Sequence, residues 1–133
     1  MKLKLASTFV VCALSVVLFA CSPAPKATIT VTCDDFAKQQ NIVASADTPF
    51  TVGKSFTVSL CSDPSTGLQW QESATINDQT VVQQTAHKRM SGRDVWTFKA
   101  LSEGHALLFM ESTSSSPGAD GGQRTFRLTV AVQ

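Results

Sequence analysis

The stretch DVWTFKALSEGHALLFME, residues 94–111, decides the fold class of this chain. Its first part places Trp96, Phe98 and Ala100 on one side of an extended chain. Its second part, residues 105–111, is apolar on both faces at its middle, which is typical of a strand in the centre of a sheet. Both parts therefore predict β-strands.

The same period of two recurs on either side of this stretch. Residues 27–33, 55–61 and 124–132 alternate apolar side chains with polar ones, and residues 68–74 and 80–85 do so more weakly. Only residues 34–41 are compatible with a helical turn. About seven short strands in roughly 105 residues predict one all-β domain, an antiparallel β-sandwich, with no internal repeat and no second domain.

The N-terminal segment has the pattern of a secretory signal. Lys2 and Lys4 are followed by an uncharged run over residues 5–20. The run ends in LFAC, which resembles the cleavage box of bacterial lipoproteins and predicts a lipid on Cys21. The alternative is a plain signal peptide, or an uncleaved anchor, in which this cysteine has no such role. We expect a signal peptide over residues 1–20, a lipidated Pro- and Ala-rich tether over residues 21–28, and the folded domain over residues 29–133.

The charge balance excludes several classes of partner. The full chain has 11 basic and 10 acidic residues, and removal of Lys2 and Lys4 with the signal leaves 9 basic residues and a net charge of −1. No basic patch indicates nucleic acid, and no polybasic cluster indicates a direct contact with membrane lipids. We expect an exported protein of the cell envelope that is anchored to the membrane through its N-terminal lipid and faces outward.

The cysteines agree with export. Cys12 lies in the signal and Cys21 at the lipid site, so Cys33 and Cys61 remain as one pair in a compartment where disulfides persist. A bridge between them would close a loop of roughly 29 residues, worth about 3.5 kcal/mol in the chain-entropy model. The alternative is a metal pair, but no further ligands lie nearby at zinc spacing. We favour the disulfide and expect neither a metal nor a cofactor.

Three polar segments are candidates for functional loops at the ends of the sandwich. The first, residues 63–67, is stiff because Pro64 fixes its own φ and Gly67 allows a positive one. The second spans residues 87–94, and the third, residues 112–123, is long and rich in Gly and Ser. Any one such loop is more often a simple connection than a contact surface.

Other conspicuous side chains favour structural roles. Trp70 and Trp96 lie in alternating segments and are expected in the core or in half-buried packing rather than as platforms for a ligand. His87 is expected to be solvated in the polar second segment, and His105, which opens a strand directly after Gly104, to have a role in the turn rather than in catalysis. Neither histidine has a Ser, Cys or carboxylate partner at a spacing that indicates a catalytic triad, so we expect no enzyme.

Two motifs together resemble one family. DPSTGLQW, residues 63–70, resembles the Asn-Pro-Thr-Thr-Gly-aromatic-x-Trp motif of the chagasin-type inhibitors of papain-like cysteine peptidases. GRDVWTFKALSEGHALLFMES, residues 92–112, is similar to the family's segment from a Gly-containing loop through Trp-x-Phe-x-Ala to a Gly-led strand. The likeness covers most of residues 54–132. It implies an immunoglobulin-like fold, export (in some members as a bacterial lipoprotein) and an inhibitor rather than an enzyme.

The resemblance also implies how the inhibitor acts. Three neighbouring loops straddle the peptidase cleft, and the first enters the catalytic centre with Thr66 nearest the catalytic cysteine. We therefore expect a monomer whose partner is a papain-like cysteine peptidase. The implied contact residues are Asp63, Pro64, Ser65, Thr66, Gly67 and Leu68 in the first loop, Ser91, Gly92 and Arg93 in the second, and Ser116, Pro117 and Gly118 in the third.

Three places depart from the family pattern. Asp63 replaces Asn, and Leu68 replaces an aromatic residue. In the third loop Ser116 and Gly118 flank Pro117, so the Arg and Trp of the family's Arg-Pro-Trp are both missing. Because Arg and Trp are frequent binding hot spots, their loss leaves a second hypothesis open: a surface-anchored binding or adhesion module with the same fold but no peptidase target.

Overall fold

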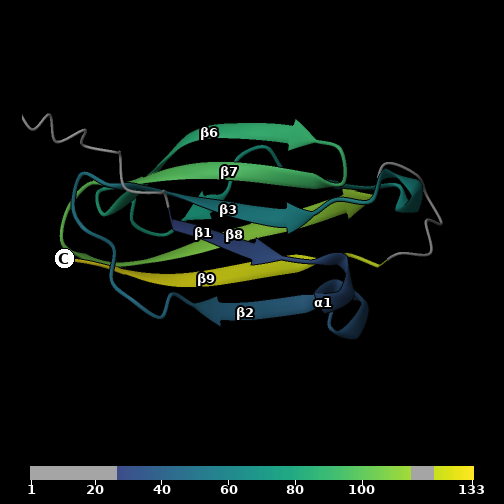
Figure 1. Ribbon diagram of the computed structural model, residues 1–133, viewed down its shortest axis with the longest axis horizontal. Helices are drawn as coiled ribbons and strands as arrows, with labels where there is room; N and C mark the ends of the chain where they lie inside the picture. Colours follow the sequence, from purple (N-terminus) through teal and green to yellow (C-terminus); the bar gives the residue numbers. More distant parts are fainter. Residues whose placement is uncertain (1–26, 115–121) are drawn as a thin grey trace, which may run out of the picture.

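The computed structural model describes residues 27–114 and 122–133, which form two β-sheets packed face to face with a short helix at one end (Figure 1). These residues contain nine strands, and the predicted all-β sandwich is confirmed. The predicted signal peptide, residues 1–20, lies outside the described residues. Of the predicted tether, only Ala27 and Thr28 are described, and they already belong to the first strand. In the described part of the chain, no helix has the length and apolar character to cross a membrane.

The first sheet has the strand order β1-β3-β7-β6. The bounds are Ala27–Val31 for β1, Ser55–Cys61 for β3, Arg93–Ala100 for β7 and Val82–Met90 for β6. The pairs β3–β7 and β6–β7 are antiparallel, as expected, whereas β1 joins β3 in parallel. A parallel pair is possible here because the chain crosses to the other sheet between these two strands, so no tight hairpin connects them.

The second sheet has the order β2-β9-β8-β4, and β5 pairs with β8 as well. The bounds are Asn41–Ser45 for β2, Thr125–Val132 for β9, Gly104–Ser114 for β8, Leu68–Trp70 for β4 and Thr75–Ile76 for β5. β2 is a second parallel edge strand and lies beside β9. It was not predicted, because Ile42, Val43 and Ala44 are consecutive apolar residues without alternation.

The alternating strands place their apolar faces between the sheets. The predicted core positions of Trp70 and Trp96 are confirmed, with 3% and 0% of their area exposed, and their rings meet edge to face at 6.1 Å. At about 1.5–3 kcal/mol for each large apolar side chain, burial of this layer is the main stabilising term. The other large side chains with no exposed area include Phe56, Val58, Leu60, Phe98, Leu108, Met110, Phe126, Leu128 and Val130.

The helix α1, Cys33–Lys38, carries the chain from the first sheet to the second. Because β1 runs parallel to β3 and Val31 pairs with Leu60, α1 begins beside the end of β3. Thr32 caps the helix: its hydroxyl accepts from the N–H of Asp35 at 3.3 Å, and the Asp35 carboxylate accepts from the N–H of Thr32 at 2.8 Å. This reciprocal pair satisfies two donors at the helix start and confirms the helical turn expected in residues 34–41.

A disulfide joins Cys33 to Cys61, with the two Cα atoms 5.1 Å apart. The predicted bridge is therefore confirmed. It links the first residue of α1 to the last residue of β3, across 28 positions of the sequence.

Candidate functional site

Two of the three predicted loops, together with the strand ends that flank the third, meet at one end of the sandwich (right-hand end of Figure 1). The first loop, residues 62–67, follows β3, and the second loop, Ser91 and Gly92, joins β6 to β7. The backbone N–H of Ser62 donates to the carbonyl oxygen of Gly92 at 3.0 Å, which ties these loops together. On the other side, Leu68 pairs with Ser114, the last residue of β8.

The first loop closes through hydrogen bonds of its own, around a single 3₁₀ turn, Pro64–Thr66. The Asp63 carboxylate accepts from the N–H of Ser65 at 3.0 Å and from its hydroxyl at 2.6 Å. The N–H and the hydroxyl of Thr66 both donate to the Asp63 carbonyl, at 3.2 and 2.7 Å. Gly67 ends the turn with φ of 70° in the left-handed region, where a side chain is disfavoured. The loop is therefore stiff before it meets a partner.

The charge of Asp63 is stabilised by the loop that it caps. The hydroxyl of Ser65 is the main cause that lowers the pKa of Asp63 below its usual value of 3.8, with smaller contributions from the Ser65 N–H and the positive charge of Arg124. Asn and Asp are both good caps of helical turns. The replacement of Asn by Asp at this position therefore preserves the cap.

The exposed tip of the first loop is small. Pro64 and Ser65 are exposed, whereas Asp63, Thr66 and Gly67 are half-buried. Leu68, also expected to contact a partner, is only 8% exposed and opens β4, so it supports the loop from within.

The second loop is a tight two-residue turn. Met90 and Arg93 pair across it, and Gly92 has φ of 80°. A Cβ at Gly92 would meet no atom within 4 Å, so the backbone angle alone calls for glycine here. Ser91, Gly92 and Arg93 are exposed, and Met90 is 41% exposed, so the predicted contact residues protrude beside the first loop.

The predicted contact residues of the third loop, Ser116, Pro117 and Gly118, lie outside the described residues. The strand ends around them are described. The N–H of Ser112 donates to the carbonyl of Arg124 at 2.9 Å, and the N–H of Arg124 donates to the Ser112 hydroxyl at 2.9 Å. These bonds join the chain before and after the third loop, next to β4.

Behind the second loop lies a polar cluster that the sequence alone did not predict. Asp94 is 1% exposed, and its Oδ2 lies 2.9 Å from Nε2 of His87 and 3.4 Å from Nε of Arg89. The His87 ring lies 4.9 Å from the Trp96 ring. Nη2 of Arg89 also donates to the carbonyl of Trp70 at 3.0 Å. The cluster thus connects the β6–β7 hairpin with the strand that follows the first loop.

The expectation of a solvated His87 in a polar loop was wrong. β6 continues to Met90, so the His87 side chain packs inward and is only 11% exposed. The hairpin register places Arg89 opposite Asp94. This pairing follows from the sequence only after the turn has been placed at residues 91–92, and the polarity of residues 87–94 favoured a longer loop instead.

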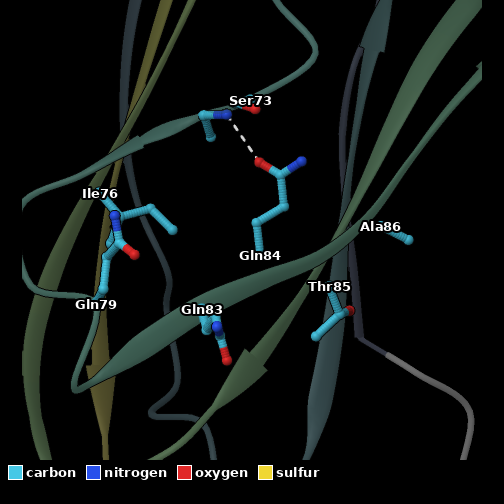
Figure 2. A pocket seen from close by; sticks show the side chains of 8 residues that line it. Ser73, Ile76, Gln79, Gln83, Gln84, Thr85 and Ala86 are labelled. Atoms are coloured by element: carbon cyan, nitrogen blue, oxygen red, sulfur yellow. Dashed lines mark hydrogen bonds between the residues drawn. The ribbon is translucent and has the colours of Figure 1, made fainter.

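The surface has one hollow at the first loop and another away from it, along β6. One of about 270 Å³ lies at the first loop and is lined by Ser62, Pro64, Gly67, Leu68, Gln69 and Arg89. Another of about 290 Å³ lies further along β6, where the Gln84 side chain reaches toward the segment at Ser73 (Figure 2). Gln84 accepts from the N–H of Ala74 at 2.8 Å and donates to the carbonyl of Glu72 at 2.9 Å. The side chain of Gln84 therefore links β6 to residues 72–74 across the second hollow.

The chemistry available at the loop end is that of a binding surface. Among the residues that the structure describes, no three His, Cys, Asp or Glu side chains gather as a metal site. The first loop offers a hydroxyl, a proline ring and a carboxylate whose hydrogen bonds are made within the loop. Such a loop can fill a complementary groove with little loss of conformational entropy.

Known proteins resemble this chain in sequence or in fold. Residues 50–130 match the model of a family described as chagasin family peptidase inhibitor I42. No protein of curated function matches the chain by sequence. The fold is similar to the cysteine protease inhibitor EhICP2 from Entamoeba histolytica, with a TM-score of 0.52 and 14% identity over 83% of this chain and 100% of that chain. It is also similar to PbICP-C, solved in complex with falcipain-2, with a TM-score of 0.58 and 13% identity over 80% of this chain and 99% of that chain.

Proposed function

Because this chain belongs to the chagasin family of peptidase inhibitors, we propose that it inhibits papain-like cysteine peptidases by placing its first loop in their active-site cleft. The second loop would contact one rim of the cleft and the third loop the other. PbICP-C, which has a similar fold, is bound to falcipain-2 in its own structure, and this supports a peptidase as the partner.

The hydrogen bond between Ser62 and Gly92 is the observation that carries the proposal. It joins the first and second loops directly, at 3.0 Å, so their tips form one surface. The Asp63 cap and the left-handed Gly67 fix the first loop internally. A surface that is already ordered loses less entropy on binding than a mobile one, so more of its contact energy remains as affinity.

This mechanism requires no reaction from the inhibitor. The peptide groups of the first loop are held in a helical turn, in which the N–H groups of Thr66 and Gly67 each donate to the carbonyl three positions earlier, those of Asp63 and Pro64. Thr66 occupies the position expected nearest the catalytic cysteine. The loop would thus cover the nucleophile while its own peptide bonds stay folded away from an extended, cleavable form.

Titration of active papain with the chain from Cys21 onward tests the proposal, with Cys21→Ser to prevent lipidation. We expect inhibition constants between about nanomolar and micromolar, and no inhibition of a serine peptidase assayed in parallel. Full papain activity at tens of micromolar inhibitor would contradict the proposal.

The third loop supports a second candidate function. Ser116 and Gly118 stand where the family motif has Arg and Trp, and these are the residue types that most often dominate binding energy. A surface-anchored binding module without a peptidase target would need neither. Affinity capture from secreted extracts distinguishes the two, because recovery of a protein that is not a cysteine peptidase, together with inactive papain titrations, favours the module.

The N-terminal segment supports a proposal about location. Lipidation of Cys21 would anchor the domain in the envelope, facing outward, with the short tether before β1. Mass spectrometry of the membrane-extracted protein should find a diacylglyceryl-modified Cys21 at its N-terminus. Recovery of the wild-type protein, with Cys21 intact, in the soluble fraction would contradict the anchor.

A further inference from the structure

We infer that α1 is a brace that holds both ends of the first loop, and that Cys33 and Phe36 are thereby positioning residues for inhibition. The effect on the loop stands on the geometry alone, whereas the effect on inhibition rests on the proposed function. α1 precedes Phe50 and so lies outside the segment that carries the family match.

The first loop is flanked by Cys61 on one side and by β4, which ends at Trp70, on the other. Cys61 is the last residue of β3, directly before the loop, and Trp70 is the last residue of β4, shortly after it. The indole Nε1–H of Trp70 donates to the Cys61 carbonyl at 2.9 Å, in a buried position. This bond closes the base of the loop.

One side of α1 contacts both of these residues. Cys33 is bonded to Cys61 through the disulfide. Phe36, three positions later and so on the same side of the helix, is 2% exposed, and its ring centre lies 5.4 Å from that of Trp70. A covalent bond thus fixes the end before the loop, and an aromatic contact fixes the end after it.

The helix is itself held in place by its surroundings. A helix of six residues is too short to be stable alone. The capping box of Thr32 and Asp35 fixes its start, and the guanidinium of Arg124 lies 5.5 Å from the centre of the Phe36 ring. The positive charge of Arg124 also helps to lower the pKa of Asp63, so Arg124 acts on the cap of the first loop as well as on α1.

The brace predicts a specific effect on the loop. Without it, the base of the first loop keeps the Trp70–Cys61 and Ser62–Gly92 hydrogen bonds and the strand pairing but loses its covalent and aromatic contacts, so residues 62–67 gain conformations that must be lost again on binding. The dissociation rate of the peptidase complex should rise, because a less ordered loop releases more easily.

The test compares two brace variants with a matched control in the chain from Cys21 onward carrying Cys21→Ser. The described core of that chain lies between Val31 and Val132, so the shortening removes none of it. The brace variants are Phe36→Ala and the double change Cys33→Ser with Cys61→Ser, and Phe36→Leu is the conservative form. The control is Phe50→Ala, which removes a ring stacked at 4.1 Å on Phe56 at the opposite end.

Two readouts are taken well below the unfolding temperature of each variant. Hydrogen exchange of the amides of residues 62–67 should become about tenfold faster or more in both brace variants and stay unchanged in Phe50→Ala. The inhibition constant for papain, desalted after activation so that the disulfide stays intact, should rise about tenfold or more in the brace variants. It should rise less than about twofold in the control, with Phe36→Leu in between.

The outcomes separate the brace from the proposed function. Unchanged exchange of residues 62–67 in folded brace variants overturns the inference. Inhibition that weakens equally in Phe50→Ala also overturns it, because a general loss of stability then explains the effect. Faster exchange with a wild-type chain that does not inhibit papain supports the brace and removes the proposed function.

Discussion

Nε2 of His87 lies 2.9 Å from Oδ2 of Asp94, and both side chains are withdrawn from solvent directly behind the second loop. The carboxylate also lies 3.4 Å from Nε of Arg89. A buried carboxylate is tolerated only where such partners compensate for its lost hydration. This arrangement makes the start of β7 and the end of β6 one polar unit at the base of the turn.

Replacement of Asp94 by Ala should therefore lower the free energy of unfolding by about 2–3 kcal/mol, because His87 and Arg89 lose their buried acceptor. Urea denaturation measures the change. Asp47→Ala, at an exposed aspartate, is the control and should change stability by less than about 0.5 kcal/mol. A loss below about 1 kcal/mol for Asp94→Ala would mean that the cluster is not stabilising.

The strands in the middle of the sheets could be predicted because their apolar residues alternate. β3 has the bounds Ser55–Cys61 that its pattern indicates, and its Phe56, Val58 and Leu60 are fully buried. The parallel edge strand β2 could not be predicted in this way. Its pairing with β9 depends on the direction in which the chain leaves α1. This is a tertiary relationship rather than a local pattern.

In the candidate site, too, local features could be predicted from the sequence and tertiary contacts could not. The stiffness of the first loop could be predicted, because the effects of Pro64 and Gly67 on the backbone are local. The disulfide followed from the count of cysteines. The inward packing of His87 and the contact between Phe36 and Trp70 could not be predicted, since they depend on a hairpin register and on residues 34 positions apart meeting.

The cap of the first loop predicts a pH dependence. Because the folded pKa of Asp63 lies below its usual 3.8, its contribution to stability is present above that value and is lost as the pH falls through the folded pKa. Wild type should therefore be more stable than Asp63→Asn at about pH 6, and the difference should shrink as the pH falls below 3.8 and through the folded pKa. Urea denaturation across this range measures it.

Ser65→Ala provides the matched variant for this prediction. It removes the hydroxyl that is the main cause of the lowered pKa of Asp63 and leaves the N–H in place. The pH-dependent part of its stability should lie between those of wild type and Asp63→Asn. A stability difference between wild type and Asp63→Asn that is constant with pH would show that the charge of Asp63 has no role in the cap.

The third loop predicts a gain of affinity. If residues 116–118 meet the peptidase, Ser116→Arg combined with Gly118→Trp should lower the inhibition constant for papain about tenfold or more, because both new side chains are typical hot spots. Ser116→Ala with Gly118→Ala is the control and should leave the constant within about twofold. An unchanged constant for the Arg and Trp variant would show that this loop does not reach the peptidase.

Backbone conformation at Gly67 offers the sharpest separation of function from stability. Gly67 and Gly53 have similar positive φ values, 70° and 84°, but Gly67 ends the first loop, whereas Gly53 precedes β3 at the opposite end of the sandwich. A Cβ at Gly53 would meet no atom within 4 Å, so the strain of a side chain there is purely one of backbone angle.

Gly67→Val and Gly53→Val should each destabilise the fold by about 1–2 kcal/mol. Only Gly67→Val should weaken inhibition of papain, by about tenfold or more, because it alone distorts the tip that we propose enters the cleft. Equal inhibition by the two variants would exclude the first loop from the contact.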